Sequence, residues 1–386
     1  MTWKPASVPP RVTDTAVRAR GRGSGEPGDG RRFLRAFGDQ EFVTESGASL
    51  GPVEVAFETW GSLNASGTNA ILVLHALTGD SHAAAGGAQS DPGWWEGLIG
   101  HGAAIDTSRW FVVCPNVLGG CRGTTGPSST APDGRPYGSR FPSITIRDQV
   151  AVEKRLADVL GIRAWAAVVG GSMGGMRALE WAVSYPASVE RAVFLAVGAA
   201  ASAEQIALCS LQTRAIRLDP NFAGGDYYGL EAGPWEGMAI ARGIGQLSYR
   251  SSEEMEQRFG RSGQDGEDPL AGGRYAIQSY LDHHGVKLAR RFDPNSYITL
   301  STAMNHHDVG RGRGGIRSAL SGVEADVTVV GISSDRLYPL AQQLELASLL
   351  PGRRPVRVVE SAVGHDGFLV ETGAVAEAIA EALGDT

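Results

Sequence analysis

Cysteine is scarce in this sequence and long apolar runs are missing, and both absences narrow what the protein can be. The three cysteines, Cys114, Cys121 and Cys209, are an odd and low number, which argues against a disulfide-stabilised secreted domain. No apolar run approaches the roughly 20 residues that a bilayer-spanning helix needs. The first residues also lack the apolar centre of a signal peptide. We therefore expect a cytoplasmic protein with no membrane partner.

Dense basic segments are also missing beyond the first thirty or so residues. The formal net charge is −7, so a nucleic-acid partner is not expected. Residues 1–32 are rich in Gly, Pro, Arg and Thr without hydrophobic periodicity, and we expect a flexible tail there. The rest of the chain has enough apolar residues for a sizeable core, since they make up 42% of the whole.

After the tail, short apolar runs alternate with helix-like segments, which is typical of a parallel sheet with helices on both faces. The runs that predict buried strands are residues 70–74, 110–114, 164–169, 191–197, 327–331 and 356–360. Residues 202–308 show no strand pattern and look amphipathic and helical. We predict an α/β fold of the α/β-hydrolase type, with a mostly parallel central sheet formed by residues 33–201 and 309–386. The helical segment 202–308 is then an insertion that covers the site as a lid.

Ser172 stands at the centre of a Gly-x-Ser-x-Gly segment, residues 170–174. Because 53 of the 386 residues are glycine, these five residues alone also fit an ordinary Gly-rich turn. Their context decides between the two interpretations. A predicted strand precedes the segment and a predicted helix follows it, which is the setting of a nucleophile elbow.

A serine nucleophile needs a base, and the base needs a carboxylate that orients it. Asp335 and His365 each follow a predicted strand, in the chain order Ser, Asp, His that α/β-hydrolases use. The alternatives are a turn or helix-capping aspartate at Asp335 and an exposed loop histidine at His365. The tetrahedral intermediate also needs amide donors, which we expect from Met173 and Leu77. The plain alternative for residues 75–79 is a connecting loop, and we assign no metal ligands.

Long segments of the chain resemble the homoserine O-acetyltransferases, which are acyltransferases with the α/β-hydrolase fold. The matching segments are residues 74–82, 114–129, 170–181, 304–315 and 362–368. The resemblance extends from residue 31 to the C-terminus, and its motifs are long and specific. One departure lies off the proposed triad, where the family usually has an acidic residue and this chain has Asn305.

The resemblance implies an acetyl transfer from acetyl-CoA to Ser172 and then to the hydroxyl of L-homoserine, with no bound cofactor. The product, O-acetyl-L-homoserine, feeds methionine synthesis. By the same resemblance, Arg242 holds the substrate carboxylate, Asp366 holds its ammonium, and the protein is a homodimer formed through the lid helices. From the residues alone, Arg242 also fits a helix-surface arginine and Asp366 a helix N-cap.

Other activities fit the same residues. Close variants of the reaction use succinyl-CoA as donor or L-serine as acceptor, and Arg122 and Arg177 are nearby cations that could hold a succinyl carboxylate. An esterase or thioesterase would release the acyl group to water instead. A non-catalytic binding protein is the remaining class, and the complete set of Ser172, Asp335 and His365 argues against it.

Overall fold

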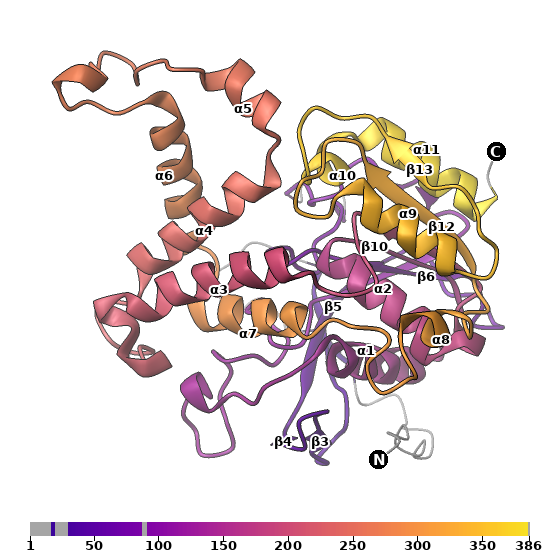
Figure 1. Cartoon of the computed structure of the whole chain (residues 1–386). Helices are drawn as coiled ribbons and strands as arrows, with labels where there is room; N and C mark the ends of the chain where they lie inside the picture. The colour runs from indigo at the N-terminus through magenta and orange to yellow at the C-terminus, as the bar shows by residue number, and fades with distance from the viewer. Residues whose placement is uncertain (1–16, 20–29, 87–90, 385–386) are drawn as a thin grey trace.

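A computed structural model describes residues 17–19, 30–86 and 91–384 (Figure 1). Its centre is a sheet with the strand order β1-β2-β5-β9-β6-β10-β11-β12-β13. Neighbouring strands from β9 to β13 are parallel, whereas β5, β2 and β1 are added antiparallel at one edge. The strands of this sheet are β1 Val17–Ala19, β2 Arg32–Arg35, β5 Glu54–Trp60, β6 Ala70–Leu74, β9 Phe111–Pro115, β10 Trp165–Gly171, β11 Arg191–Leu195, β12 Asp326–Ile332 and β13 Arg357–Val359.

Helices cover both faces of the sheet, and each face has its own apolar core. Along β6, Leu72 and Leu74 pack into one core, while Ile71 and Val73 pack into the other, as the alternation of side chains in a strand requires. Helices α1, α2 and α9 pack on the first face and α11 packs on the second. The helices are α1 Ile146–Leu160, α2 Met173–Ser184, α3 Ala203–Leu218, α4 Trp235–Tyr249, α5 Ser252–Phe259, α6 Ala276–Ala289, α7 Pro294–Asn305, α8 Ile316–Leu320, α9 Leu340–Leu349, α10 Gly367–Val370 and α11 Thr372–Leu383.

Helices α3 to α7 lie between β11 and β12 in the chain and form an insertion that projects beyond the sheet (Figure 1). Helix α4 packs against both α3 and α6, and α7 packs against α3. The helical character of residues 202–308 was expected from the sequence, and no named strand lies in this stretch, which the structure describes in full. The insertion begins after the carboxyl end of β11, which is the edge of the sheet where ligands bind in such folds.

The two connections between the insertion and the sheet run side by side. Ala201 donates a backbone hydrogen bond to His307 (2.9 Å), and Val309 donates one to Ala199 (3.1 Å). The buried ring of His307 also lies 3.0 Å from the carbonyl oxygen of Gly198. The start and the end of the insertion are therefore held together where they leave the sheet.

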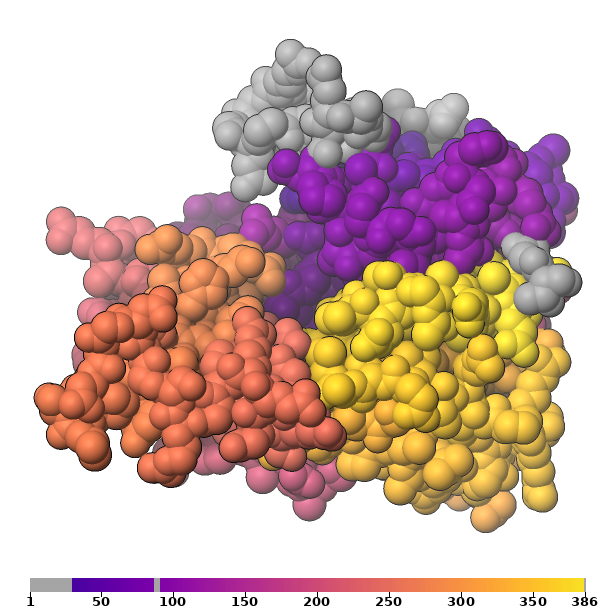
Figure 2. Space-filling model, turned by 90° about the horizontal axis from the view of Figure 1, so that it is seen from above, coloured from indigo at the N-terminus to yellow at the C-terminus, as the bar shows by residue number. Residues whose placement is uncertain are grey.

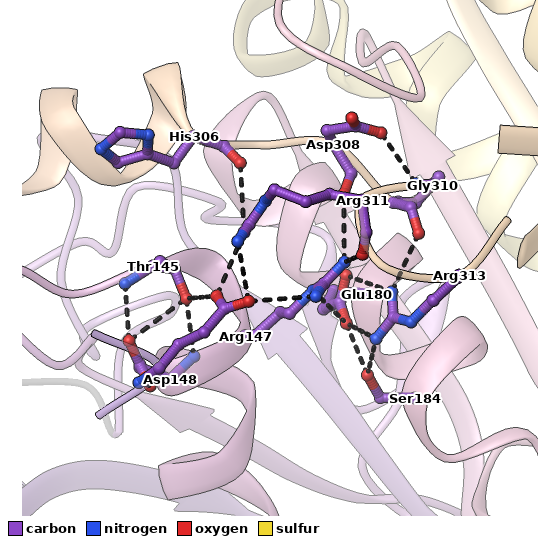
Figure 3. Close-up of polar contacts among 12 residues, drawn as sticks. Thr145, Arg147, Asp148, Glu180, Ser184, His306, Asp308, Gly310, Arg311 and Arg313 are labelled. Atoms are coloured by element: carbon purple, nitrogen blue, oxygen red, sulfur yellow. Dashed lines mark hydrogen bonds and ion pairs between the residues drawn. The ribbon is translucent and has the colours of Figure 1, made fainter. Parts of the chain in front are cut away.

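Charged side chains reinforce this joint (Figure 3). Arg311 and Arg147 both bind the carboxylate of Glu45, at 2.7 and 3.0 Å. Arg313 binds Glu180 of α2 at 2.5 Å, and Arg147 lies 3.7 Å from the same carboxylate. We call these five residues the joint network. It links the loop that returns from the insertion to α1, to α2 and to the short hairpin that carries Glu45.

Some elements differ from the sequence predictions. The edge strands β2 and β1 were not predicted, because they are short and lack a clear apolar alternation. Strand β1 falls inside the predicted tail of residues 1–32, of which residues 1–16 and 20–29 lie outside the described part of the chain. In residues 42–60, apolar and polar residues alternate around a glycine-containing break, which predicts an antiparallel pair of strands. The structure has a short antiparallel hairpin there, β3 Phe42–Val43 and β4 Ser49–Leu50, followed by β5 in the central sheet. The small sheet of β7 Ile99–Gly100 and β8 Ile105–Asp106 was not predicted either.

Candidate active site

Ser172 lies in the turn between β10 and α2, and the backbone there is tightly constrained. Its φ of 57° and ψ of −123° are strained for a residue with a side chain. A Cβ at Gly170 would stand 2.3 Å from the Gly174 carbonyl oxygen, and one at Gly174 would stand 2.0 Å from that of Leu74. Only glycine fits at these two positions, so the Gly-x-Ser-x-Gly pattern has the physical cause that a nucleophile elbow requires.

The structure brings together the three residues that the sequence singled out for nucleophilic chemistry. The Nε2 atom of His365 lies 2.9 Å from the Ser172 hydroxyl, and its Nδ1 atom lies 2.6 Å from Asp335 Oδ2. All three residues are buried, and His365 is 2% exposed. An imidazole held in this way can accept the serine proton through Nε2 while the carboxylate fixes Nδ1–H.

Asp335 has two functions in the fold. Its Oδ1 accepts hydrogen bonds from the amides of Leu337 and Tyr338, at 2.9 and 2.8 Å, and its Oδ2 faces His365. The sequence allowed two interpretations of Asp335, a turn aspartate or a carboxylate that orients the base. One side chain makes both sets of contacts. Burial opposes a charge on His365, but the nearby carboxylate of Asp335 raises the pKa of His365 above its ordinary value.

The amides of Leu77 and Met173 fit the donors that an oxyanion would need. Met173 is the first residue of α2, and Leu77 lines the cavity that contains Ser172. Within the described part of the chain, neither amide N–H donates a hydrogen bond to another group. Two free donors therefore remain beside the nucleophile.

The loop that contains Leu77 is held from beneath by buried polar groups. Arg177 of α2 is fully buried, binds Glu153 at 2.6 Å and donates to the carbonyl oxygen of His75 at 2.6 Å. The His75 ring accepts from the Val117 amide at 3.1 Å, and burial followed by the charge of Arg177 lowers the pKa of His75 well below its ordinary value. A neutral His75 and a paired Arg177 thus fix the backbone at the start of this loop.

A cavity of about 230 Å³ opens above Ser172. Arg242 lines it, donates to Gln246 at 2.7 Å and stacks over the Tyr249 ring at 5.1 Å. Arg242 is therefore part of the cavity wall, where a carboxylate-binding group is expected. Its planar donor fork is suited to a carboxylate.

Asp366 also lines this cavity. It stands at the N-cap position of α10, but its side chain makes no capping hydrogen bond. The carboxylate therefore does not act as the helix N-cap that the sequence also allowed. Arg250 approaches it to 3.5 Å. Burial raises the pKa of Asp366, and the positive charges of His365 and Arg250 oppose that shift.

Several residues of this cavity were missed by the sequence analysis. The rings of Tyr338 and Tyr249 lie 5.1 and 6.0 Å from the ring of His365. Arg291 adds a cation to the lining, and Arg250 contacts Asp366 without lining the cavity. No motif marks them, since they depend on how the insertion and the loop after β12 fold over the sheet. Arg122 and Arg177, considered for a succinyl donor, do not line the cavity.

Among the described residues there is neither a metal-binding cluster nor a bilayer-crossing helix. No group of three or more His, Cys, Asp and Glu side chains in that part of the chain is arranged to hold a metal ion. No helix within residues 17–19, 30–86 and 91–384 combines the length and the apolar character that a bilayer crossing requires.

Comparison with known proteins places this geometry in a family. The protein-family model described as alpha/beta hydrolase fold matches residues 69–372. A homoserine O-acetyltransferase of Thermobifida fusca is 59% identical over 362 residues, which cover 93% of this chain and 95% of the relative. The chain belongs to the homoserine O-acetyltransferase family.

Solved structures agree with this family assignment. The homoserine O-acetyltransferase of Bacillus anthracis superposes with a TM-score of 0.84 at 30% identity, covering 92% of this chain and 96% of its own. An esterase named E22 superposes with a TM-score of 0.82 at 29% identity, covering 92% and 99%. The fold of the homoserine O-acetyltransferase family thus also occurs in a protein named as an esterase, so the acceptor must be argued from the site.

Proposed function

We propose that this protein transfers the acetyl group of acetyl-CoA to L-homoserine, through an acetyl-enzyme on Ser172. The observation that carries the proposal is the continuous hydrogen-bonded chain from Asp335 through His365 to Ser172. It lies at the base of a cavity whose lining includes two cations, Arg242 and Arg291, and the carboxylate of Asp366. The family membership supports both substrates. The product, O-acetyl-L-homoserine, serves methionine synthesis.

In the first half-reaction, His365 accepts the proton of Ser172 while the hydroxyl oxygen attacks the thioester carbonyl carbon. The oxyanion that forms is stabilised by the amides of Leu77 and Met173. The carbon–sulfur bond then breaks, and His365 returns the proton to the departing thiolate. In the second half-reaction, His365 deprotonates the homoserine hydroxyl, whose oxygen attacks the acetyl ester. The bond between the acetyl carbon and the Ser172 oxygen then breaks, and His365 returns the proton to that oxygen.

The acceptor is a zwitterion, and the cavity has complementary charges. Arg242 would bind its carboxylate through two parallel hydrogen bonds, and Asp366 would bind its ammonium. Asp366 directly follows His365 in the chain. An ammonium bound to Asp366 would therefore hold the acceptor near the imidazole that must deprotonate its hydroxyl. The insertion above the cavity acts as a lid that limits hydrolysis of the acetyl ester.

We also propose a homodimer formed through the insertion. Helices α3, α4 and α6 carry large apolar side chains that are 44–69% exposed, and such a surface is typical of a protein interface. The residues are Leu211, Leu218, Ile240, Leu247 and Val286. The cytoplasmic location stays a prediction.

The test is the release of free thiol from acetyl-CoA and from succinyl-CoA, each with L-homoserine, with L-serine and without an acceptor. The proposal predicts fast release only for acetyl-CoA with L-homoserine. Fast release without an acceptor would make the protein a thioesterase, and preference for succinyl-CoA or L-serine would identify the corresponding family variant.

A further inference from the structure

A second cavity, of about 380 Å³, adjoins the cavity of Ser172. The two cavities share Arg291, which lies in the loop between α6 and α7 and lines both of them. The insertion, the loops of the first half of the chain and the C-terminal segment, which together line the cavity of Ser172, meet on the face shown in Figure 2. Arg291 is therefore placed where a long ligand would pass from the surface to the nucleophile.

The charges around Arg291 favour an anion. Its guanidinium donates one hydrogen bond, to the Thr78 carbonyl oxygen at 3.0 Å. No ion pair joins Arg291 to a carboxylate among the described residues. Burial and then the charges of Arg242 and Arg122 lower the pKa of Arg291, whereas Asp80 acts in the opposite direction. Since Asp80 is already 3.9 Å from Arg122, positive charge is in excess here.

The second cavity is bounded by aromatic rings that are held in place. The hydroxyls of Tyr227 and Tyr228 donate to Asp293 Oδ1 at 2.6 and 3.0 Å, and their rings lie 4.6 Å apart. Trp235 lines the same cavity, and its side chain is 46% exposed. Fixed rings next to cations are suited to a nucleotide, because bases stack on aromatic faces and arginine binds phosphate. Arg290 adds a second cation to the lining.

We propose that Arg291 binds a phosphate of the acyl donor and that the cavity bounded by Tyr228 and Trp235 receives the donor's adenosine group. The pantetheine arm then passes Arg291 and delivers the thioester to Ser172. This inference rests on the proposed function and deepens it, because it assigns the binding site of the nucleotide half of acetyl-CoA. Both groups act in donor binding and take no part in proton transfer.

The test compares two donors that have the same thioester and arm. Acetyl-CoA carries the adenosine and phosphates, and acetyl-pantetheine lacks them. With L-homoserine as acceptor, Arg291→Gln is expected to raise the KM for acetyl-CoA about tenfold and to leave kcat within about twofold, since a charge-assisted hydrogen bond to phosphate is lost only from binding. The kinetics with acetyl-pantetheine stay unchanged. Arg291→Lys keeps a charge and gives an intermediate KM.

Arg163→Gln is the matched control. Arg163 is exposed and lies just before β10, at the end of that strand opposite to Ser172. The kinetics of this variant with both donors should equal those of the wild type. Equal loss with both donors would overturn the inference, since Arg291 would then act through the Thr78 loop. An unchanged KM for acetyl-CoA would overturn it as well. Calorimetric binding of CoA gives a readout without turnover, and Arg291→Gln should weaken it about tenfold.

Trp235→Leu tests the adenosine site separately. Loss of a stacking face is expected to raise the KM for acetyl-CoA about fivefold and to leave that for acetyl-pantetheine unchanged. An unchanged KM for both donors would overturn this placement of the base. If the wild type transfers no acetyl group to L-homoserine from either donor, the proposed function itself fails, which is a different result from any shift among the variants.

Discussion

The two ends of helix α2 carry polar networks that are built in different ways. At its N-terminus, Ser172 belongs to a single chain of three residues, in which the hydrogen bonds to His365 are 2.9 and 2.6 Å long. At its C-terminal half, Glu180 belongs to the joint network, in which Arg147 and Arg313 contact the same carboxylate and each also has other partners. The first network has no redundancy, and the second has several contacts for each charge.

This difference separates chemistry from support. In the first network no second side chain can take over the step that Ser172 or His365 performs, so a substitution of either should remove activity and leave the fold. In the joint network the charges hold the insertion to the sheet at a distance from the nucleophile, so a substitution should reduce stability and leave the chemistry. Each variant below is expected to change mainly activity or mainly stability, and the result tests the contrast between the two networks.

The largest effect is expected from Ser172→Ala, which removes the nucleophile. Acetyl transfer should fall by about 10⁴-fold or more, because no other group in the chain of three can form the acetyl ester. The melting temperature should match that of the wild type, since alanine keeps the Cβ and the backbone conformation and only the hydrogen bond to His365 is lost. Turnover above a trace in a steady-state thiol-release assay would contradict the covalent mechanism.

Asp335→Asn should lower kcat/KM by about 10³-fold and shift its pH profile. The asparagine carbonyl still accepts from the amides of Leu337 and Tyr338, but its NH₂ group faces Nδ1 of His365. His365 acts as a base when neutral, so activity rises with pH through its pKa. Because the carboxylate raises the pKa of His365, its loss should move the inflection to lower pH. An inflection at the wild-type pH would show that Asp335 does not set this pKa.

Arg242→Lys should affect the two half-reactions unequally. A lysine cannot reproduce the donor fork, so kcat/KM for L-homoserine should fall about tenfold or more. The pre-steady-state rate of acetyl-enzyme formation should stay within about twofold, because the first half-reaction does not use the acceptor carboxylate. If both rates fell equally in a rapid-quench experiment, Arg242 would have another function.

Glu180→Gln should produce the opposite pattern at the other end of α2. The Glu180 side chain is 2% exposed, and its loss removes the buried carboxylate that Arg313 binds, while Arg147 keeps its ion pair with Glu45. We expect the free energy of unfolding to fall by about 3 kcal/mol, measured by denaturant titration, with kcat within about twofold where the protein is folded. A loss of kcat with unchanged stability would mean that the joint network acts in catalysis.

The smallest effect is expected for an exposed ion pair. Arg354 lies 2.7 Å from Asp326, and both side chains are about half exposed, at 56% and 46%. Solvent screens such a pair, so Arg354→Gln should change the free energy of unfolding by roughly 0.5 kcal/mol or less. A cost near that of Glu180→Gln in the same titration would remove the contrast between buried and exposed charges.

The three residues of the chain at Ser172 could be predicted from the sequence for a physical reason. Each follows a strand of a parallel sheet, so the topology alone brings Ser172, Asp335 and His365 to one edge. The glycines of the elbow are required by close backbone contacts, which makes the motif readable without the structure. The order of strands and helices along the chain likewise allowed the fold class to be predicted.

Other residues of the site depend on contacts that no pattern in the sequence reveals. Arg291 reaches both cavities, and Arg250 reaches Asp366, only because of the path of the insertion. Tyr338 lines the cavity of Ser172 because of the turn at Asp335. The segment 304–315, which helped to identify the family, contributes mainly to the joint between the insertion and the sheet. A specific motif can therefore mark a structural joint as well as a chemical group.

The central claim, an acetyl ester on Ser172 that is passed to L-homoserine, can be tested by intact-protein mass spectrometry after mixing with acetyl-CoA and no acceptor. The account predicts a mass increase of one acetyl group on the wild type, none on Ser172→Ala, and a return to the original mass when L-homoserine is added, with O-acetyl-L-homoserine as the product. A wild type that forms O-acetyl-L-homoserine while never carrying an acetyl group, even in rapid-quench samples, would contradict it.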